Sequence, residues 1–273
     1  MSVGMLTPEL TRLRRILAAA GWSGLGLIAI AVMLADFLAR APLGAAHTGP
    51  VLAAPSEAFP FGTDLLGRDM FSETLYGLST TVAQAGEAAV LALLAGGLLG
   101  FVCAHLPRPA GNVLRWAIGA FAAIPALLLA LAMVALTARG YAGLAAGLAA
   151  APLAFVRAFD RARAAGRLGH AEYARATGIS ASALLNRDLA YEFRDTLLPT
   201  LARALAAVAI ILSTMSFLGF GALPPHRDLG LMIAAARTSY LEAWWTVAFP
   251  ALALMLLILL ARLAAGLDEG ERP

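Results

Sequence analysis

The residue types that catalyse reactions or bind metals are few in this chain of 273 residues. The sequence contains no lysine, which excludes a P-loop for nucleotide phosphates and Schiff-base chemistry on a lysine amine. The single cysteine, Cys103, lies in an apolar run and has no partner for an intrachain disulfide. No H-E-x-x-H or G-x-S-G motif occurs, and the histidines are too scattered for metal-ligand spacing: His47, His105, His170 and His226. We therefore expect no catalytic residue and no metal site.

Two polar residues interrupt a long apolar run. Gln84 and Glu87 lie in its first half, where a charged group is costly and usually faces a cavity or a partner. Glu87 is therefore a candidate for lining a transmembrane pathway, together with Gln84. Pairing of Glu87 with a neighbouring helix near the membrane interface is the alternative.

The stretch EYARATG, residues 172–178, lies in the one long polar segment of the chain, which extends from Arg157 to about Arg203. Glu172 and Arg175 are three residues apart and can pair on one face of a helix. Gly178 suits a helix stop or a tight turn. The pattern favours a helix–turn–helix lying across the membrane surface, with a simple solvated loop as the alternative.

The composition shows what kind of protein must position these residues. Apolar residues make up 60% of the chain and charged residues 14%, whereas soluble domains carry about 25% charged residues. The net charge of +3 is small and the arginines lie between apolar runs, so nucleic-acid binding is not expected. Six runs approach or exceed the roughly 20 residues that a helix needs to cross a bilayer. They are Ile16–Leu38, Thr80–His105, Val113–Leu136, Tyr141–Phe159, Leu201–Gly219 and Trp244–Leu263. The expected fold is an all-α integral membrane protein with six transmembrane helices.

The arginines predict the orientation of these helices. Most lie in the N-terminus, in the turn with Arg108 and Arg115, in the segment from Arg157 to Arg203 and in the C-terminal tail. Six spans place all four regions on one side, which the positive-inside rule makes cytoplasmic. The expected organisation is residues 1–40 as N-terminus and first helix, 41–79 as an outer loop, and 80–268 as a core with a cytoplasmic loop at about 160–200. Residues 269–273 form the tail.

Three local features refine this organisation. In FGTDLLGRDMFSETLYGLST, residues 61–80, Thr63 or Asp64 is expected to cap an amphipathic interfacial helix whose polar face carries Arg68, Asp69 and Glu73. Pro125 lies midway in the third run and predicts a kink, as a packing feature or as a structural hinge. Glycines in the second run favour close packing between helices: Gly96, Gly97 and Gly100.

Three ordered motifs together resemble the inner-membrane permease subunits of ATP-binding-cassette (ABC) importers, and specifically the dipeptide/oligopeptide/nickel group. GTDLLGRDMFSETLYG resembles the outer signature before the second span of that group. Glu172-Tyr173-Ala174 followed by Gly178 resembles its EAA loop, and SFLGFGALPP followed by Gly230 resembles its fifth-span exit. The resemblance covers roughly residues 60–268. It departs from the family pattern where Tyr173 replaces an alanine, where Leu198-Pro199 comes later than usual, and where no acidic residue follows Arg115.

The resemblance implies a fold, partners and a mechanism. The fold would be an N-terminal helix plus the five-helix core of type I ABC importers. The chain would enclose a pathway with a second homologous permease, and two cytoplasmic ABC ATPases would bind ATP and Mg²⁺, leaving this chain without a cofactor. A periplasmic or lipid-anchored substrate-binding protein would dock outside, in a bacterial inner membrane. Glu172, Tyr173, Ala174 and Gly178 would couple the permease to an ATPase.

Other functions remain as alternatives. The implied substrate is a dipeptide or oligopeptide, with nickel or a metal chelate as the second choice. A secondary transporter would show inverted repeats or several intramembrane charges, which are not evident here. An intramembrane enzyme would need a nucleophile–base pair or a metal cluster, and a purely structural membrane subunit would not need an EAA-like segment.

Overall fold

The computed structural model describes residues 8–137, 141–166, 197–221 and 227–266 of the chain. The long helices are α1 (Pro8–Met33), α3 (Met70–Ala92), α7 (Ala142–Gly166), α10 (Leu198–Phe217) and α12 (Trp245–Ala264). α3 continues through a π-helical turn, η1 (Leu93–Leu98), into α4 (Leu99–Ala104). The shorter elements are α2 (Ala35–Leu38), α5 (Arg108–Ala122), α6 (Ala126–Leu136), α11 (Leu229–Ala235) and the 3₁₀ turn η4 (Ala236–Thr238).

The all-α membrane fold is confirmed for the described residues. Five helices are long and apolar enough to cross a membrane, and the bent pair α5–α6 makes a sixth span if it crosses as one unit. The described residues contain no strand, and only one isolated β-bridge joins Thr63 to Asp69. Each expected span has a helical counterpart, the third as the bent pair, and one end differs by seven or more residues at α1, α3 and α7.

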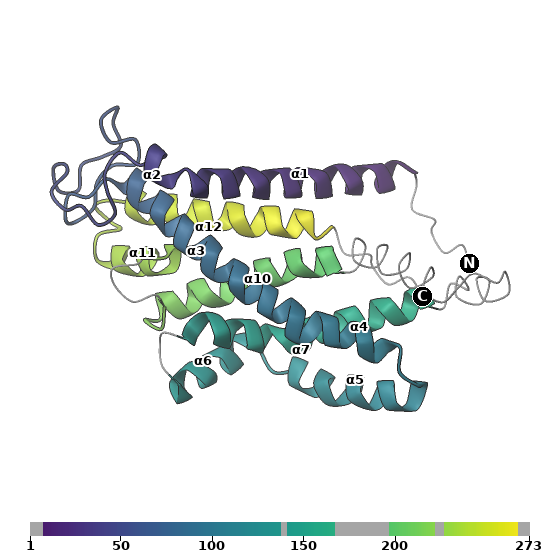
Figure 1. Cartoon of the computed structure of the whole chain (residues 1–273). Coiled ribbons are helices and arrows are strands. Elements are labelled where there is room, and N and C mark those ends of the chain that lie inside the picture. Colours follow the sequence, from purple (N-terminus) through teal and green to yellow (C-terminus); the bar gives the residue numbers. More distant parts are fainter. Residues whose placement is uncertain (1–7, 138–140, 167–196, 222–226, 267–273) are drawn as a thin grey trace.

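The helices run side by side and share two ends (Figure 1). At one end lie α2, residues 39–69 and α11, and we call it the loop end. At the other end α1 begins, α4 and α7 end, α10 begins and α12 ends. We call this the arginine end, because Arg12, Arg108, Arg163, Arg203 and Arg262 lie on the helix termini there. The helix starts and ends that lie together at the arginine end are those that the predicted six-span topology places on one side.

The core is centred on α7 and α10. In each of these helices 61% of the most apolar 18-residue stretch is buried, against 11% in α1 and 22% in α12. The buried residues of the main core are mostly alanine and valine, with few large side chains such as Leu212, Met215 and Leu257. Small side chains let helices approach closely, which is how membrane helices gain packing energy when lipid supplies no hydrophobic driving force between them.

Glycines bring the α3–α4 helix into backbone contact with α7. A Cβ atom added at Gly96 would lie 2.0 Å from the carbonyl oxygen of Ala151, and one at Gly100 would lie 2.3 Å from that of Phe155. In the reverse direction, a Cβ at Gly147 would lie 2.7 Å from the carbonyl oxygen of Ala88. The expected close packing at Gly96 and Gly100 is confirmed, whereas Gly97 faces the side chain of Leu93 on its own helix.

The third predicted span is broken rather than kinked. α5 ends at Ala122, α6 begins at Ala126, and the two helices are bent by 78°. Pro125 is the N-cap of α6. Proline has no backbone N–H to donate to the preceding turn, so α5 cannot continue through it. Pro125 therefore marks a break between two helices, and its role as a moving hinge stays a prediction.

The predicted start of the amphipathic helix is wrong. Residues 39–69 contain no helix, and α3 begins at Met70 with Asp69 as its N-cap, accepting a hydrogen bond from the backbone N–H of Ser72 at 3.1 Å. From Met70 the helix continues into the membrane span without interruption. The continuous helix from α3 to α4 has 35 residues and is about 52 Å long, which exceeds the roughly 30 Å hydrocarbon core. Part of it must therefore extend beyond the core, and its first turns lie at the loop end.

We predict that Gly96→Ala lowers stability because the new methyl group meets the backbone of α7. The expected cost is about 1–3 kcal/mol, typical of overpacking. The measurement is the apparent melting temperature of the detergent-purified protein. Gly86→Ala is the matched control on the same helix, since nothing lies within 4 Å of its Cβ position. Equal melting temperatures for the two variants would contradict the backbone contact.

Candidate functional site

The GTDLLGRD segment forms a tight turn at the loop end, directly before α3. Gly62 and Gly67 adopt φ angles of +70° and +65°, which favour glycine. The Asp64 carboxylate accepts hydrogen bonds from the backbone N–H groups of Leu66 at 2.8 Å and Arg68 at 3.0 Å. It also pairs with the Arg68 guanidinium, whose Nε lies 2.6 Å from Oδ2. The carboxylate of Asp64 thus holds the turn together by binding both its backbone and the side chain of Arg68.

The charged side chains of this segment are buried and its leucines are exposed, the opposite of the predicted amphipathic pattern. Arg68, Asp69 and Glu73 are 8%, 3% and 4% exposed, while Leu65 and Leu66 are 47% and 48% exposed. Hydrogen bonds offset part of the cost of burying these charges, although Asp69 Oδ1 and Glu73 Oε2 accept none from the described residues. Ser72 donates to Asp69 at 2.6 Å, and the backbone N–H of Gly44 donates to Glu73 Oε1 at 2.9 Å.

The turn is also fixed to the start of α12. The indole Nε1 of Trp245 donates to the carbonyl oxygen of Thr63 at 3.0 Å. Phe61 stacks on Phe249, with ring centroids 3.9 Å apart. Trp245 is buried and Trp244 is exposed, and an exposed tryptophan at the end of a span is typical of the membrane interface.

A short helix, α11, lies between α10 and α12. Asp228 caps it by accepting from the backbone N–H of Leu231 at 2.9 Å, and it also accepts from Ser216 Oγ on α10 at 2.7 Å. A Cβ at Gly230 would lie 2.3 Å from the carbonyl oxygen of Ser213. Gly230 is therefore required for the close approach of α11 to α10. His226 and Pro224-Pro225 lie outside the described residues.

Glu87 lies at the middle of the α3–α4 helix on a face that no described helix covers. It is exposed, as are Ala83, Val90 and Leu94 on the same face, and no described residue forms a hydrogen bond or ion pair with it. Gln84 is half-buried on the adjacent face. The two residues predicted to line a pathway thus stand near each other on one helix.

The arginine end contains specific links between neighbouring helices. Arg115 on α5 forms a bidentate ion pair with Asp160 on α7, at 2.5 and 2.7 Å. Arg163 donates to the carbonyl oxygen of Leu106 at 3.1 Å. On the other side of the bundle, Arg203 near the start of α10 donates to the carbonyl oxygen of Ala265 after α12 at 3.1 Å. The described termini of α7 and α10 are therefore braced against adjacent elements.

The predicted coupling residues lie outside the described residues: Glu172, Tyr173, Ala174 and Gly178. What the structure describes is the two helices that lead into and out of that segment, α7 and α10. The described residues contain no group of three or more His, Cys, Asp or Glu side chains that could hold a metal ion.

Sequence reasoning missed the buried ion pair of Asp64 with Arg68, the role of Trp245 and the partner of Arg115. The signal for the first was present, since two glycines five residues apart around an Asp indicate a turn rather than a helix. Asp160 could not be found from local pattern because it is 45 residues from Arg115. It supplies from another helix the acid that does not follow Arg115 in sequence.

These features define a multi-pass helical membrane subunit with a folded loop layer at one end and braced helix termini at the other. No protein-family model matches the chain. It is 30% identical over 220 residues to the di/tripeptide transport system permease protein DppC of Pseudomonas aeruginosa, covering 79% of this chain and 72% of that protein. It is 29% identical over 210 residues to the probable D,D-dipeptide permease DdpC of Escherichia coli, covering 75% and 70%. It is 28% identical over 207 residues to the glutathione permease GsiD of Pectobacterium atrosepticum, covering 75% and 69%.

The chain belongs to the family of permease subunits of peptide-transport ABC systems. The resemblance inferred from the three motifs is thereby confirmed. Such permeases are non-catalytic membrane subunits, carry no cofactor and work with the other components of a transport system.

We predict that Arg68→Met destabilises the loop end, because the carboxylates of Asp64 and Glu73 would stay buried without their cation. Breaking a buried pair costs about 3–5 kcal/mol. The measurement is the apparent melting temperature of the purified protein. The control is Arg40→Met, which removes exposed hydrogen bonds to the carbonyl oxygens of Glu57 and Ala58 at 3.2 and 2.9 Å. That loss should cost about 1 kcal/mol. A shift for Arg68→Met no larger than the control would show that the ion pair is not structural.

Proposed function

We propose that this chain is the pathway-forming subunit of a bacterial importer of short peptides. The observation that carries the proposal is the 30% identity to a di/tripeptide permease over most of both chains. The substrates named for the relatives from Escherichia coli and Pectobacterium atrosepticum are a dipeptide and glutathione, which supports peptides over nickel or a metal chelate. The proposed assembly pairs the chain with a second homologous permease, two cytoplasmic ABC ATPases and an external substrate-binding protein.

The proposed orientation places the arginine end in the cytoplasm. Cytoplasmic loops carry an excess of arginine and lysine. The described starts of α1 and α10 and the described ends of α7 and α12 lie at the arginine end, and the EAA-like segment falls between α7 and α10 in the sequence. The loop end would then face the periplasm, where the binding protein docks.

The proposed coupling element is the segment with Glu172, Tyr173, Ala174 and Gly178. A coupling element transmits movement only if its attachments are stiff. The ion pair of Arg115 with Asp160 and the hydrogen bond from Arg203 to Ala265 support this, because they brace the helices on either side of the segment. An ATPase that displaced this segment would move α7 and α10, the two most buried helices, and with them the bundle core.

The proposed pathway face is the exposed face of α3 that carries Glu87. A carboxylate at the centre of a bilayer costs about 2.5–3.5 kcal/mol even on insertion scales. Contact of this face with lipid would incur that cost, whereas contact with an aqueous pathway or with the second permease would not. Gln84, on the adjacent face, adds a second polar group to the same region.

We expect Gly178→Leu and Glu172→Ala to uncouple the transporter without preventing its assembly. Peptide-stimulated ATP hydrolysis of the reconstituted complex should fall to near its unstimulated level, since the coupling segment no longer fits the ATPase. The subunit should still reach the membrane and co-purify with its partners. Gly143→Leu is the control, because open space surrounds that glycine in the described residues. Normal stimulation in Gly178→Leu, or a purified complex without ATPase subunits, would count against the proposed function.

A cysteine at position 87 tests the pathway face. In a Cys103→Ser background, Glu87→Cys should react with a water-soluble maleimide several-fold faster than Met255→Cys, which lies on the exposed apolar face of α12. The reason is that thiol reaction requires water and thiolate. The rate is measured in the assembled complex in liposomes. Equal, slow labelling at both positions would place Glu87 away from water and favour pairing with another helix.

A further inference from the structure

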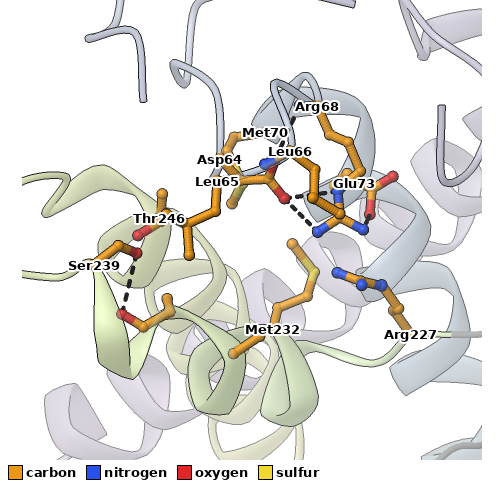
Figure 2. A pocket seen from close by; sticks show the side chains of 12 residues that line it. Asp64, Leu65, Leu66, Arg68, Met70, Glu73, Arg227, Met232, Ser239 and Thr246 are labelled. Carbon is orange, nitrogen blue, oxygen red and sulfur yellow. Dashed lines mark hydrogen bonds and ion pairs between the residues drawn. The ribbon is translucent and has the colours of Figure 1, made fainter. Parts of the chain in front are cut away.

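A cavity of about 240 Å³ lies at the loop end, between the GTDLLGRD turn, α11 and the start of α12. Figure 2 shows the side chains that line it. Met70 and Met232 form an apolar wall of the cavity. The charged residues that line it are Asp64, Arg68, Glu73 and Arg227.

The charges of the cavity are not equally compensated. Arg68 is paired with Asp64, and its Nη1 lies 3.8 Å from Glu73 Oε2. Arg227 is half-buried and forms no hydrogen bond or ion pair with the part of the chain that the structure describes. In Figure 2 its guanidinium points toward Arg68 and Met232. Burial, and then the charge of Arg68, lower the pKa of Arg227, while Glu73 and Asp64 oppose this shift. Of the two cavity arginines, Arg227 is thus the one that no described carboxylate contacts directly.

The acids of the cavity limit which anion can compensate the charge of Arg227. Glu73 is 4% exposed, and its Oε2 accepts no hydrogen bond from the described residues. Together with Asp64 it repels a second negative charge, which disfavours a dianion such as phosphate. A monocarboxylate matches the planar fork of a guanidinium with two parallel hydrogen bonds.

We propose that this cavity binds a small monocarboxylate with an apolar body, held by Arg227 through its carboxylate and by Met70 and Met232 through its side chain. The volume lies below the roughly 300–1,000 Å³ typical of sites for drug-sized ligands, so it suits one amino-acid residue. Resting on the proposed function, the source is the C-terminal residue of a short peptide. The cavity is then an accessory peptide subsite at the outer entrance of the permease.

The test measures binding of four probes to the full chain in nanodiscs by isothermal titration calorimetry. The probes are alanyl-leucine, its C-terminal amide, N-acetyl-leucine and inorganic phosphate. Alanyl-leucine and N-acetyl-leucine should bind, because both carry the free carboxylate. The amide should bind at least about tenfold more weakly, since a hydrogen bond to a charged group contributes about 1.5–3 kcal/mol. Phosphate should not compete.

Variants connect the binding to Arg227. Arg227→Gln should lower the affinity for alanyl-leucine as much as amidation of the peptide does. Arg227→Lys should have an affinity between those of Arg227→Gln and the unmodified chain, because lysine keeps the charge but lacks the planar guanidinium. Arg237→Gln is the matched control, since Arg237 is exposed and lies over the ring of Phe217 instead of in the cavity. Its affinity should equal that of the unmodified chain.

The results that overturn the inference are specific. They are equal affinity for the amide, unchanged affinity in Arg227→Gln, or no binding of any carboxylate probe. If binding fails while the reconstituted complex still imports alanyl-leucine with coupled ATP hydrolysis, the subsite is wrong and the proposed function stands. If no ATPase co-purifies while the carboxylate probes bind as expected, the proposed function fails and the site remains as a monocarboxylate site.

Discussion

Backbone contact between the α3–α4 helix and α7 is the constraint on which the rest of the structure depends. Lipid offers no hydrophobic gain for bringing two helices together, so stability comes from the number of atoms in close contact. Gly96, Gly100 and Gly147 remove the side chains that would hold the two backbones apart. The alanine-rich core around α7 and α10 extends the same principle to the other helices. Because these faces fit at backbone distance, no space remains for a side chain between the two helices at these positions.

The two ends of the bundle use charge in different ways. At the loop end, Arg68 and Asp69 are buried and tie the irregular segment to the start of α3, while the indole of Trp245 fixes it to α12. At the arginine end, Arg115 and Asp160 are about half exposed and join two helices across the surface of the bundle. Buried charges enforce one conformation because every alternative leaves a charge unpaired. An exposed pair contributes less stability than a buried one, so this bidentate pair supplements the packing of α5 against α7 rather than replacing it.

This difference supports a mechanical view of the subunit. On the proposed function, a rigid loop layer would provide a fixed surface for an external partner, and a stiff core would transmit displacement between the ends. The break at Pro125 makes α5 and α6 two separate bodies within one span. α5 is attached to α7 by Arg115 while α6 packs beside the opposite half of α7, so a displacement of α7 reaches both halves of the broken span.

The sequence by itself determined the all-α membrane class, the six apolar spans, the glycine contact face and the family, because hydropathy, arginine placement and contiguous motifs are local properties. Glu87 also stood out locally, as a charge within an apolar run. The periodicity of apolar residues gave a wrong prediction for Arg68 and Asp69, which it placed on the solvated face of a helix. Only the tertiary structure decided that these charges are buried, that Trp245 fixes the turn, and that Asp160 pairs with Arg115. The physical reason is that burial of a charge depends on partners distant in the chain, which no local spacing encodes.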